Sequence, residues 1–252
     1  MRKILKVFFT WMFALMMCAC TSQNANIQWL SGDGNVAGEL KTVEIDWVDG
    51  SVEVKYGKSK EVSITEKSNF PLEDDQKVHW GMAGTTLKIE YLVDKKVEIS
   101  NPLEKTLVVE IPKGLNMDSV KIEGASCLVT CLVNAENITI DTAYGDIELD
   151  IEKSSKVAIN SASGNLLLSM KEFAEVKAAT ASGNVTAEIP TDYNFTATVE
   201  TASGKVNDEL KMKKDGKTYT NGTGESNIKI DTASGNIDFK AHHETARNLT
   251  YK

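Results

Sequence analysis

Histidine is scarce in this chain of 252 residues, and its few histidines form no recognisable site. His79 lies in an alternating segment and is expected to be an ordinary strand residue. His242 and His243 are adjacent, and adjacent side chains of an extended chain point in opposite directions. A metal site built from this pair and Glu244 is therefore not expected, and we assign these residues to a solvated tail. The sequence also lacks a Ser-His-Asp grouping, a phosphate loop and a zinc pattern, so we predict no catalytic residue, no metal site and no cofactor.

Positive charge is also in short supply. The formal net charge is −8, and removal of an N-terminal segment containing Arg2, Lys3 and Lys6 would change it to −11 (−8 − 3). An acidic surface without basic clusters cannot neutralise phosphates, and phosphate neutralisation dominates the binding of nucleic acids. This composition excludes nucleic acid as a partner.

Long apolar runs are absent beyond the first twenty residues. The run from Val7 to Met17 follows a basic start and is too short to span a bilayer, which is typical of a signal peptide. Ala19 and Cys20 then resemble a bacterial lipobox. We predict a lipoprotein-type signal peptide over residues 1–20 and lipid attachment at Cys20, with Cys18 as the alternative. The acyl chains would hold the protein to a membrane at about 0.8 kcal/mol per buried methylene. The membrane leaflet and the oligomeric state stay open.

Only two cysteines, Cys127 and Cys131, lie outside the signal segment. Positions four apart in a strand are separated by about 13 Å, which is beyond the reach of a disulfide unless the chain turns between them. The two residues are either small apolar packing residues or a disulfide across a turn.

The rest of the chain divides into segments of different composition. Residues 21–39 are polar and glycine-rich, which predicts a tether. Residues 40–115 contain short segments such as "TVEIDW" and "SVEVKY", whose alternation with period two indicates half-buried strands. Whether these strands form coils or a separate cap is open at this point. Residues 241–252 are predicted to be a polar tail.

A ten-residue pattern recurs between residues 116 and 240, as in "NSASGNLLLS", "ATASGNVTAE" and "DTASGNIDFK". Its copies carry a glycine after a small residue, at Gly145, Gly164, Gly183, Gly204 and Gly235. The intervals are 19, 19, 21 and 31 residues, and the last contains a polar insertion that predicts a protruding loop. Periods near twenty indicate a stacked architecture.

The repeat predicts a coil in which equal corners stack on each other. A unit of 19 residues would span about 60 Å if straight, so it must bend to bring the next copy alongside. Successive corners would then be about 4.8 Å apart, close enough for a column of small residues (Ala143, Ala162, Ala181, Ala202, Ala233) and a polar ladder (Asp146, Asn165, Asn184, Lys205, Asn236). We predict an all-β, right-handed parallel β-solenoid with 19–21 residues per coil. The alternative is an antiparallel β-sandwich, in which matching turns would be too far apart to form a ladder.

Two kinds of chemistry compete with a purely structural repeat. A calcium ladder requires an aspartate in each unit, but the polar ladder contains one aspartate and a lysine, Lys205. A carbohydrate-active enzyme needs converging carboxylates. The column before the small residues contains Asp141, Asn160, Ala179, Glu200 and Asp231. We expect its acids not to lie on neighbouring coils.

The export signal ending in cysteine, the β-rich lead-in and the repeated "TASGN" and "TAYGDI" units make residues 40–240 similar to a known family. The chain resembles the "putative adhesin" domains of bacterial envelope proteins, a family of unknown function close in style to the head-GIN "putative auto-transporter adhesins". The resemblance implies a repeated β fold and brings no catalytic residue with it.

These observations predict an exported, lipid-anchored protein of the cell envelope that binds an envelope protein or a glycan without catalysis. One alternative is an envelope-stress sensor that passes information to a membrane partner. The other is a carbohydrate-active β-helix enzyme.

Overall fold

The computed structural model describes residues 27–91 and 104–242, which consist of strands and turns. The signal segment with Cys18 and Cys20, and the tail with His243 and Glu244, lie outside the described residues. Within these two ranges there is no helix that could cross a membrane. The strands are β1 (Leu30–Ser31), β2 (Gly34–Val36), β3 (Thr42–Gly57), β4 (Val62–Ser68), β5 (His79–Ala83), β6 (Thr86–Glu90), β7 (Lys105–Pro112), β8 (Ser119–Cys131), β9 (Asn137–Tyr144), β10 (Ile147–Ser163), β11 (Leu166–Ser182), β12 (Val185–Ile189), β13 (Phe195–Ser203), β14 (Val206–Asp208), β15 (Lys213–Asp215), β16 (Thr218–Asn221), β17 (Ser226–Ser234) and β18 (Ile237–Ala241).

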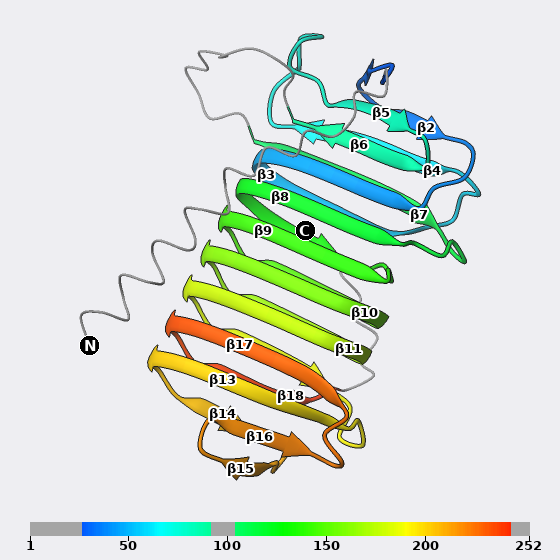
Figure 1. Ribbon diagram of the computed structural model, residues 1–252. Helices are drawn as coiled ribbons and strands as arrows, with labels where there is room; N and C mark the ends of the chain where they lie inside the picture. Colours follow the sequence, from blue (N-terminus) through cyan, green and yellow to red (C-terminus); the bar gives the residue numbers. More distant parts are fainter. Residues whose placement is uncertain (1–26, 92–103, 243–252) are drawn as a thin grey trace.

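The strands form a parallel β-solenoid, as predicted from the repeat (Figure 1). Each turn of the solenoid, here called a rung, has a front strand, a glycine corner and a back strand. In one rung β9 is the front strand, Gly145 is at the corner, and the first part of β10 is the back strand. The next rung is offset by 19 residues, because Ile147 pairs with Leu166 and Val157 pairs with Val176 in parallel register. Equal corners therefore lie on adjacent strands, which excludes the β-sandwich.

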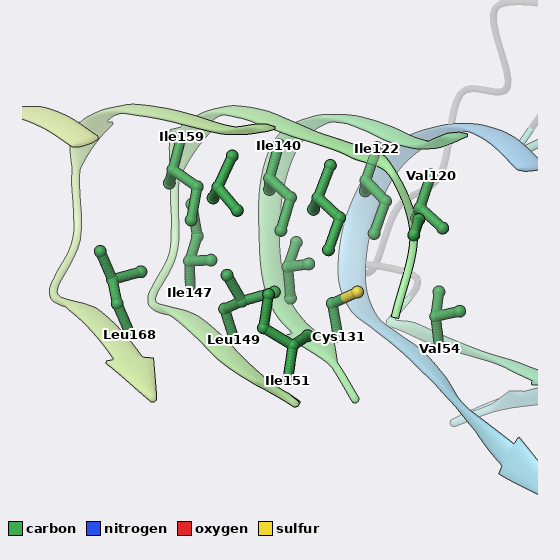
Figure 2. Close-up of a cluster of buried hydrophobic side chains, with 14 of the residues drawn as sticks. Val54, Val120, Ile122, Cys131, Ile140, Ile147, Leu149, Ile151, Ile159 and Leu168 are labelled. Carbon is green, nitrogen blue, oxygen red and sulfur yellow. The ribbon is translucent and has the colours of Figure 1, made fainter. Parts of the chain in front are cut away.

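The core is the space between the front and back strands. Alternation directs Ile140 and Ile159 inward from the front strands and Leu149 and Leu168 inward from the back strands, and all four are fully buried. Figure 2 shows the two facing rows, which continue from rung to rung. Burial of apolar surface stabilises the fold by roughly 25 cal/mol per Å², so each in-register rung extends the same core.

Cys127 and Cys131 are free thiols buried in this core, so they act as apolar packing residues. Burial raises the pKa of each thiol to about 11. Neither thiol is therefore an activated nucleophile.

The last two repeats are stacked in the reverse of their sequence order, which differs from our prediction. Strand β17 pairs with β11 on one side and with β13 on the other, and β18 likewise pairs with both β12 and β14. Figure 1 shows β17 between β11 and β13. The chain leaves one position empty after β12, forms the final rung, and returns to fill the gap. The intervals of 21 and 31 residues therefore do not correspond to single steps along the stack.

The N-terminal part contains both coils and a cap, which the sequence left open. Strand β3 lies between β8 and the rung formed by β6 and β7, so the first rung in the sequence is again second in space. Antiparallel strands cover that terminal rung: β5 pairs with β6 and β4 pairs with β7. Strands β1 and β2 pair in turn with β5 and β4. We call β1, β2, β4, β5 and their connections the N-terminal cap.

Three predicted boundaries change. Residues 27–39, expected in the tether, include β1 and β2, which are ordered by pairing with the cap. The insertion expected as a protruding loop contains the hairpin β15–β16, and β16 pairs with β13 to cover the far end of the solenoid. Ala241, assigned to the tail, ends β18, and the N–H of His242 donates to the carbonyl of Ile189 at 2.9 Å. Both ends of the stack are thus covered, which blocks edge-to-edge association.

Candidate functional site

The five predicted corner glycines form one column. A Cβ atom on Gly164 would overlap the carbonyl oxygen of Gly145, and one on Gly183 would overlap that of Gly164. Gly235 has the same relation to Gly183, and Gly204 has it to Gly235. Only glycine permits this approach of one backbone to the next. The role of the column is to allow the rungs to stack.

The predicted polar ladder follows the glycines in the spatial order of the rungs. Asp146 Oδ1 accepts the backbone N–H of Asn165 at 2.7 Å, and Asn165 Oδ1 accepts that of Asn184 at 3.1 Å. Asn184 Oδ1 then accepts from Asn236 at 2.8 Å, and Asn236 Oδ1 accepts from Lys205 at 2.9 Å. These side-chain oxygens stabilise the neighbouring rung, so the ladder is not a calcium site. Among the described residues no group of three or more His, Cys, Asp or Glu is arranged to hold a metal ion.

The inward position at each corner belongs to a hydroxyl residue, which the sequence analysis missed. The buried Thr232 donates from Oγ1 to the carbonyl of Gly183 at 3.1 Å, and Thr201 donates to Gly235 at 3.0 Å. The alanines that follow these hydroxyl residues are half-buried or exposed. The recurrence of Thr or Ser one position before each alanine was the available signal.

Four carboxylates stack on the front strands of four adjacent rungs. Asp46 pairs in register with Glu90 on one side and with Glu123 on the other, and Glu123 pairs with Asp141. We call these four residues the acidic row. It combines segments that are far apart in the sequence, and only Asp141 was a candidate from the repeat. The row ends at Asn160, which donates from Nδ2 to Asp141 Oδ1 at 2.7 Å.

The acidic row favours protonation. Partial burial is the main cause that raises the pKa of Asp46, and the charge of Glu123 adds to it while Lys121 opposes it. Burial and then the charge of Asp46 raise the pKa of Glu90. Burial also raises the pKa of Asp141, although the hydrogen bond from Asn160 acts in the opposite direction. A cationic or hydrogen-bond-donating partner would relieve this repulsion.

Exposed apolar side chains lie at the corners of the same rungs. Val48, Leu128 and Tyr144 are half or more exposed for such large residues, with Tyr144 at 62%. They belong to the corner regions of three successive rungs, and Ser126 of the middle rung pairs with Asp49 and with Tyr144. We call these three residues the apolar corner. The acidic row and the apolar corner together form the candidate binding surface.

The other candidate acids include one pair that we did not expect. Glu200 pairs in register with Asp231, so these two acids do lie on neighbouring rungs, contrary to our prediction. Each has its own lysine partner: Lys217 contacts Glu200 at 3.0 Å, and Lys229 contacts Asp231 at 2.6 Å. An exposed, charge-paired couple of this kind is typical of a solvated strand surface.

A buried ion pair joins the N-terminal cap to the solenoid, and the sequence gave no sign of it. Lys105 Nζ lies 2.6 Å from Glu66 Oε1, with side-chain exposures of 0% and 3%. Lys105 also donates to the carbonyls of Gln76 and Tyr91 and lies 4.2 Å from the centre of the Tyr91 ring. Burial lowers the pKa of Lys105, and the contact with Glu66 opposes that effect.

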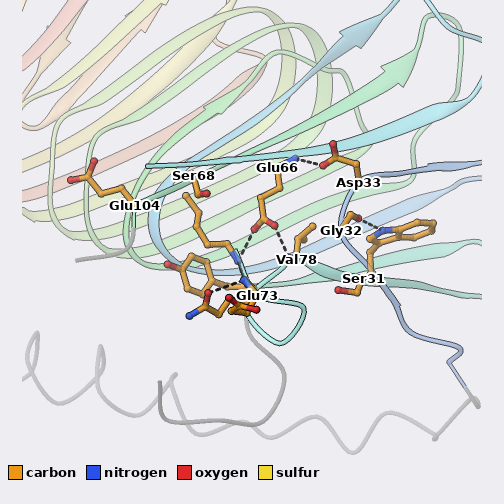
Figure 3. A network of polar contacts seen from close by, with 12 residues as sticks. Ser31, Gly32, Asp33, Glu66, Ser68, Glu73, Val78 and Glu104 are labelled. Atoms are coloured by element: carbon orange, nitrogen blue, oxygen red, sulfur yellow. Dashed lines mark hydrogen bonds and ion pairs between the residues drawn. The ribbon is translucent and has the colours of Figure 1, made fainter. Parts of the chain in front are cut away.

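Figure 3 shows how this network extends through the cap. Glu66 Oε2 accepts the N–H of Val78 at 2.8 Å, and Asp33 Oδ1 accepts the N–H of Glu66 at 2.8 Å. Trp80 Nε1 donates to the carbonyl of Gly32 at 2.8 Å. With its hydrogen bonds satisfied by cap residues, the network has a structural role.

The remaining candidates do not converge on a reaction centre. His79 is a residue of β5 opposite Glu90, as expected for a strand residue. His242 Nδ1 lies 3.0 Å from Ser169 Oγ and is therefore docked on the solenoid, which corrects its assignment to the solvated tail. A surface depression lined by residues 57–60 and 112–115 carries the exposed lysines Lys58, Lys60 and Lys113.

Comparisons with known proteins agree with this architecture. Residues 40–176 and, in an overlapping second match, residues 132–240 match the family described as Toastrack DUF4097. No curated protein matches the chain. A "putative cell adhesion protein" from Clostridium sporogenes ATCC 15579 has a similar structure, with a TM-score of 0.51 and 12% identity over 85% of this chain and 99% of that chain. At this identity the likeness shows the fold alone.

Two further structures are less similar. A "putative adhesin" from Bacteroides fragilis NCTC 9343 has a TM-score of 0.43 and 11% identity over 84% of this chain and 97% of that chain. A "putative lipid binding protein" from Parabacteroides distasonis ATCC 8503 has a TM-score of 0.34 and 15% identity, with coverages of 86% and 97%.

Proposed function

Because the chain belongs to the Toastrack DUF4097 family, we propose that it is an exported, lipid-anchored protein of the bacterial cell envelope that binds a protein or glycan partner and catalyses no reaction. The adhesin-like names of two similar structures support a binding role. The signal-like segment and Cys20 support export and anchoring.

One observation carries the binding role: the apolar corner stands beside the acidic row on the same stacked rungs. Contiguous exposed apolar groups with polar surroundings are typical of interaction sites, and exposed aromatic side chains often dominate the energy of such contacts. The strands beneath are held on both sides by the ladder, so binding needs little reordering of the backbone. The expected partner offers an apolar group to Tyr144 and hydrogen-bond donors or cations to the carboxylates.

Anchoring is tested by mass spectrometry of the mature protein from bacterial membranes. We expect an N-terminal Cys20 carrying acyl chains and fractionation with the membrane. Cys20→Ala should abolish the modification, whereas the control Cys18→Ala should leave it in place. A mature chain without acyl groups would contradict the proposed anchoring.

The binding surface is tested by in-cell photo-crosslinking. A photoreactive amino acid is introduced at Tyr144 and, as a matched control, at the exposed Ser155 on another part of the solenoid. We expect discrete adducts with protein or glycan from position 144 only, and their loss when Leu128→Ser and Glu123→Lys are added. Equal adducts from both positions, or none from position 144, would contradict the assignment of this surface.

A further inference from the structure

Strands β1 and β2 form the outermost layer of the solenoid at its N-terminal end. On the front side β1 pairs with β5 beyond the terminal rung, since Leu30 pairs with Trp80. On the back side β2 pairs with β4 in the same way, with Val36 opposite Val62. The described chain begins at Ile27, immediately before β1, so the polypeptide enters the fold through this outermost layer.

This layer exposes large apolar side chains. Trp29 is 36% exposed and Leu30 is 43% exposed, whereas the tryptophans of the core, Trp47 and Trp80, are buried. Phe70, in the connection that follows β4 of the cap, is exposed as well. The six exposed large apolar residues of the described chain therefore fall into two groups. Three belong to the apolar corner and three to the N-terminal cap.

The length of chain between the anchor and the cap limits where the membrane can be. Seven residue steps separate Cys20 from Ile27, which is a reach of at most about 24 Å. The front strands from β1 to β13 make nine spacings in the order β1, β5, β6, β3, β8, β9, β10, β11, β17, β13. At about 4.8 Å each they span about 43 Å. A lipid on Cys20 therefore cannot place the far end of an upright solenoid against the bilayer.

We propose that the N-terminal cap rests on the membrane interface, with Trp29 and Leu30 among the lipid headgroups, and that the solenoid extends away from the bilayer. Tryptophan is favoured at this depth because its ring is apolar and its N–H is polar. The inference rests on the proposed lipid anchor at Cys20. It adds the orientation of the molecule and the surface that contacts lipid.

The charges of the cap indicate that this contact is apolar in nature. Asp33, Glu73, Asp74 and Asp75 are exposed on the cap or its connections, and Lys77 is paired with Asp74 at 2.7 Å. A surface of this charge is not attracted by anionic headgroups. The lipid anchor supplies the attachment, and Trp29 and Leu30 supply the local contact.

The test uses the acylated mature protein, with its mass verified, in phosphatidylcholine vesicles that contain lipids brominated near the headgroup. Trp29 is the exposed tryptophan of the described chain, so its emission is obtained by subtracting the spectrum of the Trp29→Phe variant. We expect the Trp29 emission to shift to the blue on vesicle binding and to be lost with brominated lipid. The far end is probed by Lys213→Trp in the Trp29→Phe background, because Lys213 is exposed in β15. We expect the emission of this variant to be unchanged.

The outcomes separate this inference from the proposed function. A chain without acyl groups that does not bind vesicles would contradict the proposed anchor itself. An acylated, vesicle-bound protein whose Trp29 emission stays unchanged would leave the anchor intact and overturn the cap contact. Quenching at both Trp29 and the K213W probe would also overturn the inference, because the solenoid would then lie flat on the membrane.

Discussion

At the scale of single residues, the corner shows why its positions differ in tolerance. Each ladder residue uses its side-chain oxygen to hold the backbone N–H of the next rung. Lys205 has no carbonyl oxygen in its side chain, but it receives its hydrogen bond through its own backbone N–H. Its rung is the last in the ladder, so no further rung requires an acceptor from it. The lysine therefore marks the terminal rung.

This difference predicts unequal effects along the ladder. Asn184→Ala removes the acceptor for Asn236 N–H and should lower the free energy of unfolding by about 1 kcal/mol. Lys205→Ala keeps the backbone donor and should change it by less than about 0.5 kcal/mol. Urea unfolding of the two variants measures the difference. Equal losses would show that the ladder contributes nothing beyond the exposure of these residues.

The acidic row predicts a dependence of stability on pH. The pKa of Asp46 is raised above 3.8 in the fold, as are the pKa values of Asp141 and, above 4.5, of Glu90. A raised pKa means that the folded state binds protons more tightly than the unfolded state. The stabilisation is therefore complete at pH below the ordinary values and is lost as the pH rises through the raised values.

Asp46→Asn should remove part of this dependence. We expect the variant to be more stable than the wild type at pH 7, by up to about 1 kcal/mol, because like charges directly opposite on neighbouring strands are destabilising. The advantage should shrink as the pH falls through the raised pKa values. Thermal unfolding between pH 7 and pH 4 measures it, with Glu209→Gln at the far end as control. An advantage that grows on acidification would contradict the assigned sign.

At the scale of elements, the sequence predicts what depends on local periodicity. The alternation and the repeated corner identified the front and back strands from β8 to β18, because inward positions must be apolar at every rung. The hairpin β15–β16 was also accessible, since its two-residue loop begins with Gly216 at a φ of 58°, a position that favours glycine in tight hairpins. The protruding-loop prediction overlooked this signal.

Elements whose order comes from distant partners could not be predicted in this way. Strands β1 and β2 are short and polar, and their pairing with β5 and β4 fixes them in place. The acidic row has the same origin, because Glu90, Asp46 and Glu123 become neighbours only after β3 inserts between β6 and β8. The buried pair of Lys105 and Glu66 likewise depends on the cap. Period-two patterns contain no information on the spatial order of strands.

At the scale of the whole molecule, both ends of the solenoid follow one rule. Strand β3, from the first rung of the sequence, and strands β17 and β18, from the last, each occupy the second position from an end of the stack. Chain ends tend to fray, and here they are paired on both edges. Interior segments form the terminal rungs, and antiparallel strands cover them.

This spatial order can be tested by disulfide mapping, because the two possible orders predict different crosslinks. Ser182, Ser234 and Ser203 are exposed at equivalent corner positions, and Ser182 pairs in register with Ser234, which pairs with Ser203. Under mild oxidation Ser182→Cys with Ser234→Cys should crosslink, because adjacent strands are about 4.8 Å apart. Ser182→Cys with Ser203→Cys should not, because two strand spacings, about 9.6 Å, exceed the reach of a disulfide.

The pair Ser203→Cys with Ser234→Cys serves as the positive control, since these positions are adjacent in either order. The native thiols at Cys127 and Cys131 are buried and should not interfere. Non-reducing mass spectrometry of proteolytic peptides identifies each crosslink. If residues 182 and 203 were joined and residues 182 and 234 were not, the repeats would stack in sequence order. The return of the chain into a gap left by its own earlier turn would then be wrong, and with it the reading of Lys205 as the mark of the last rung.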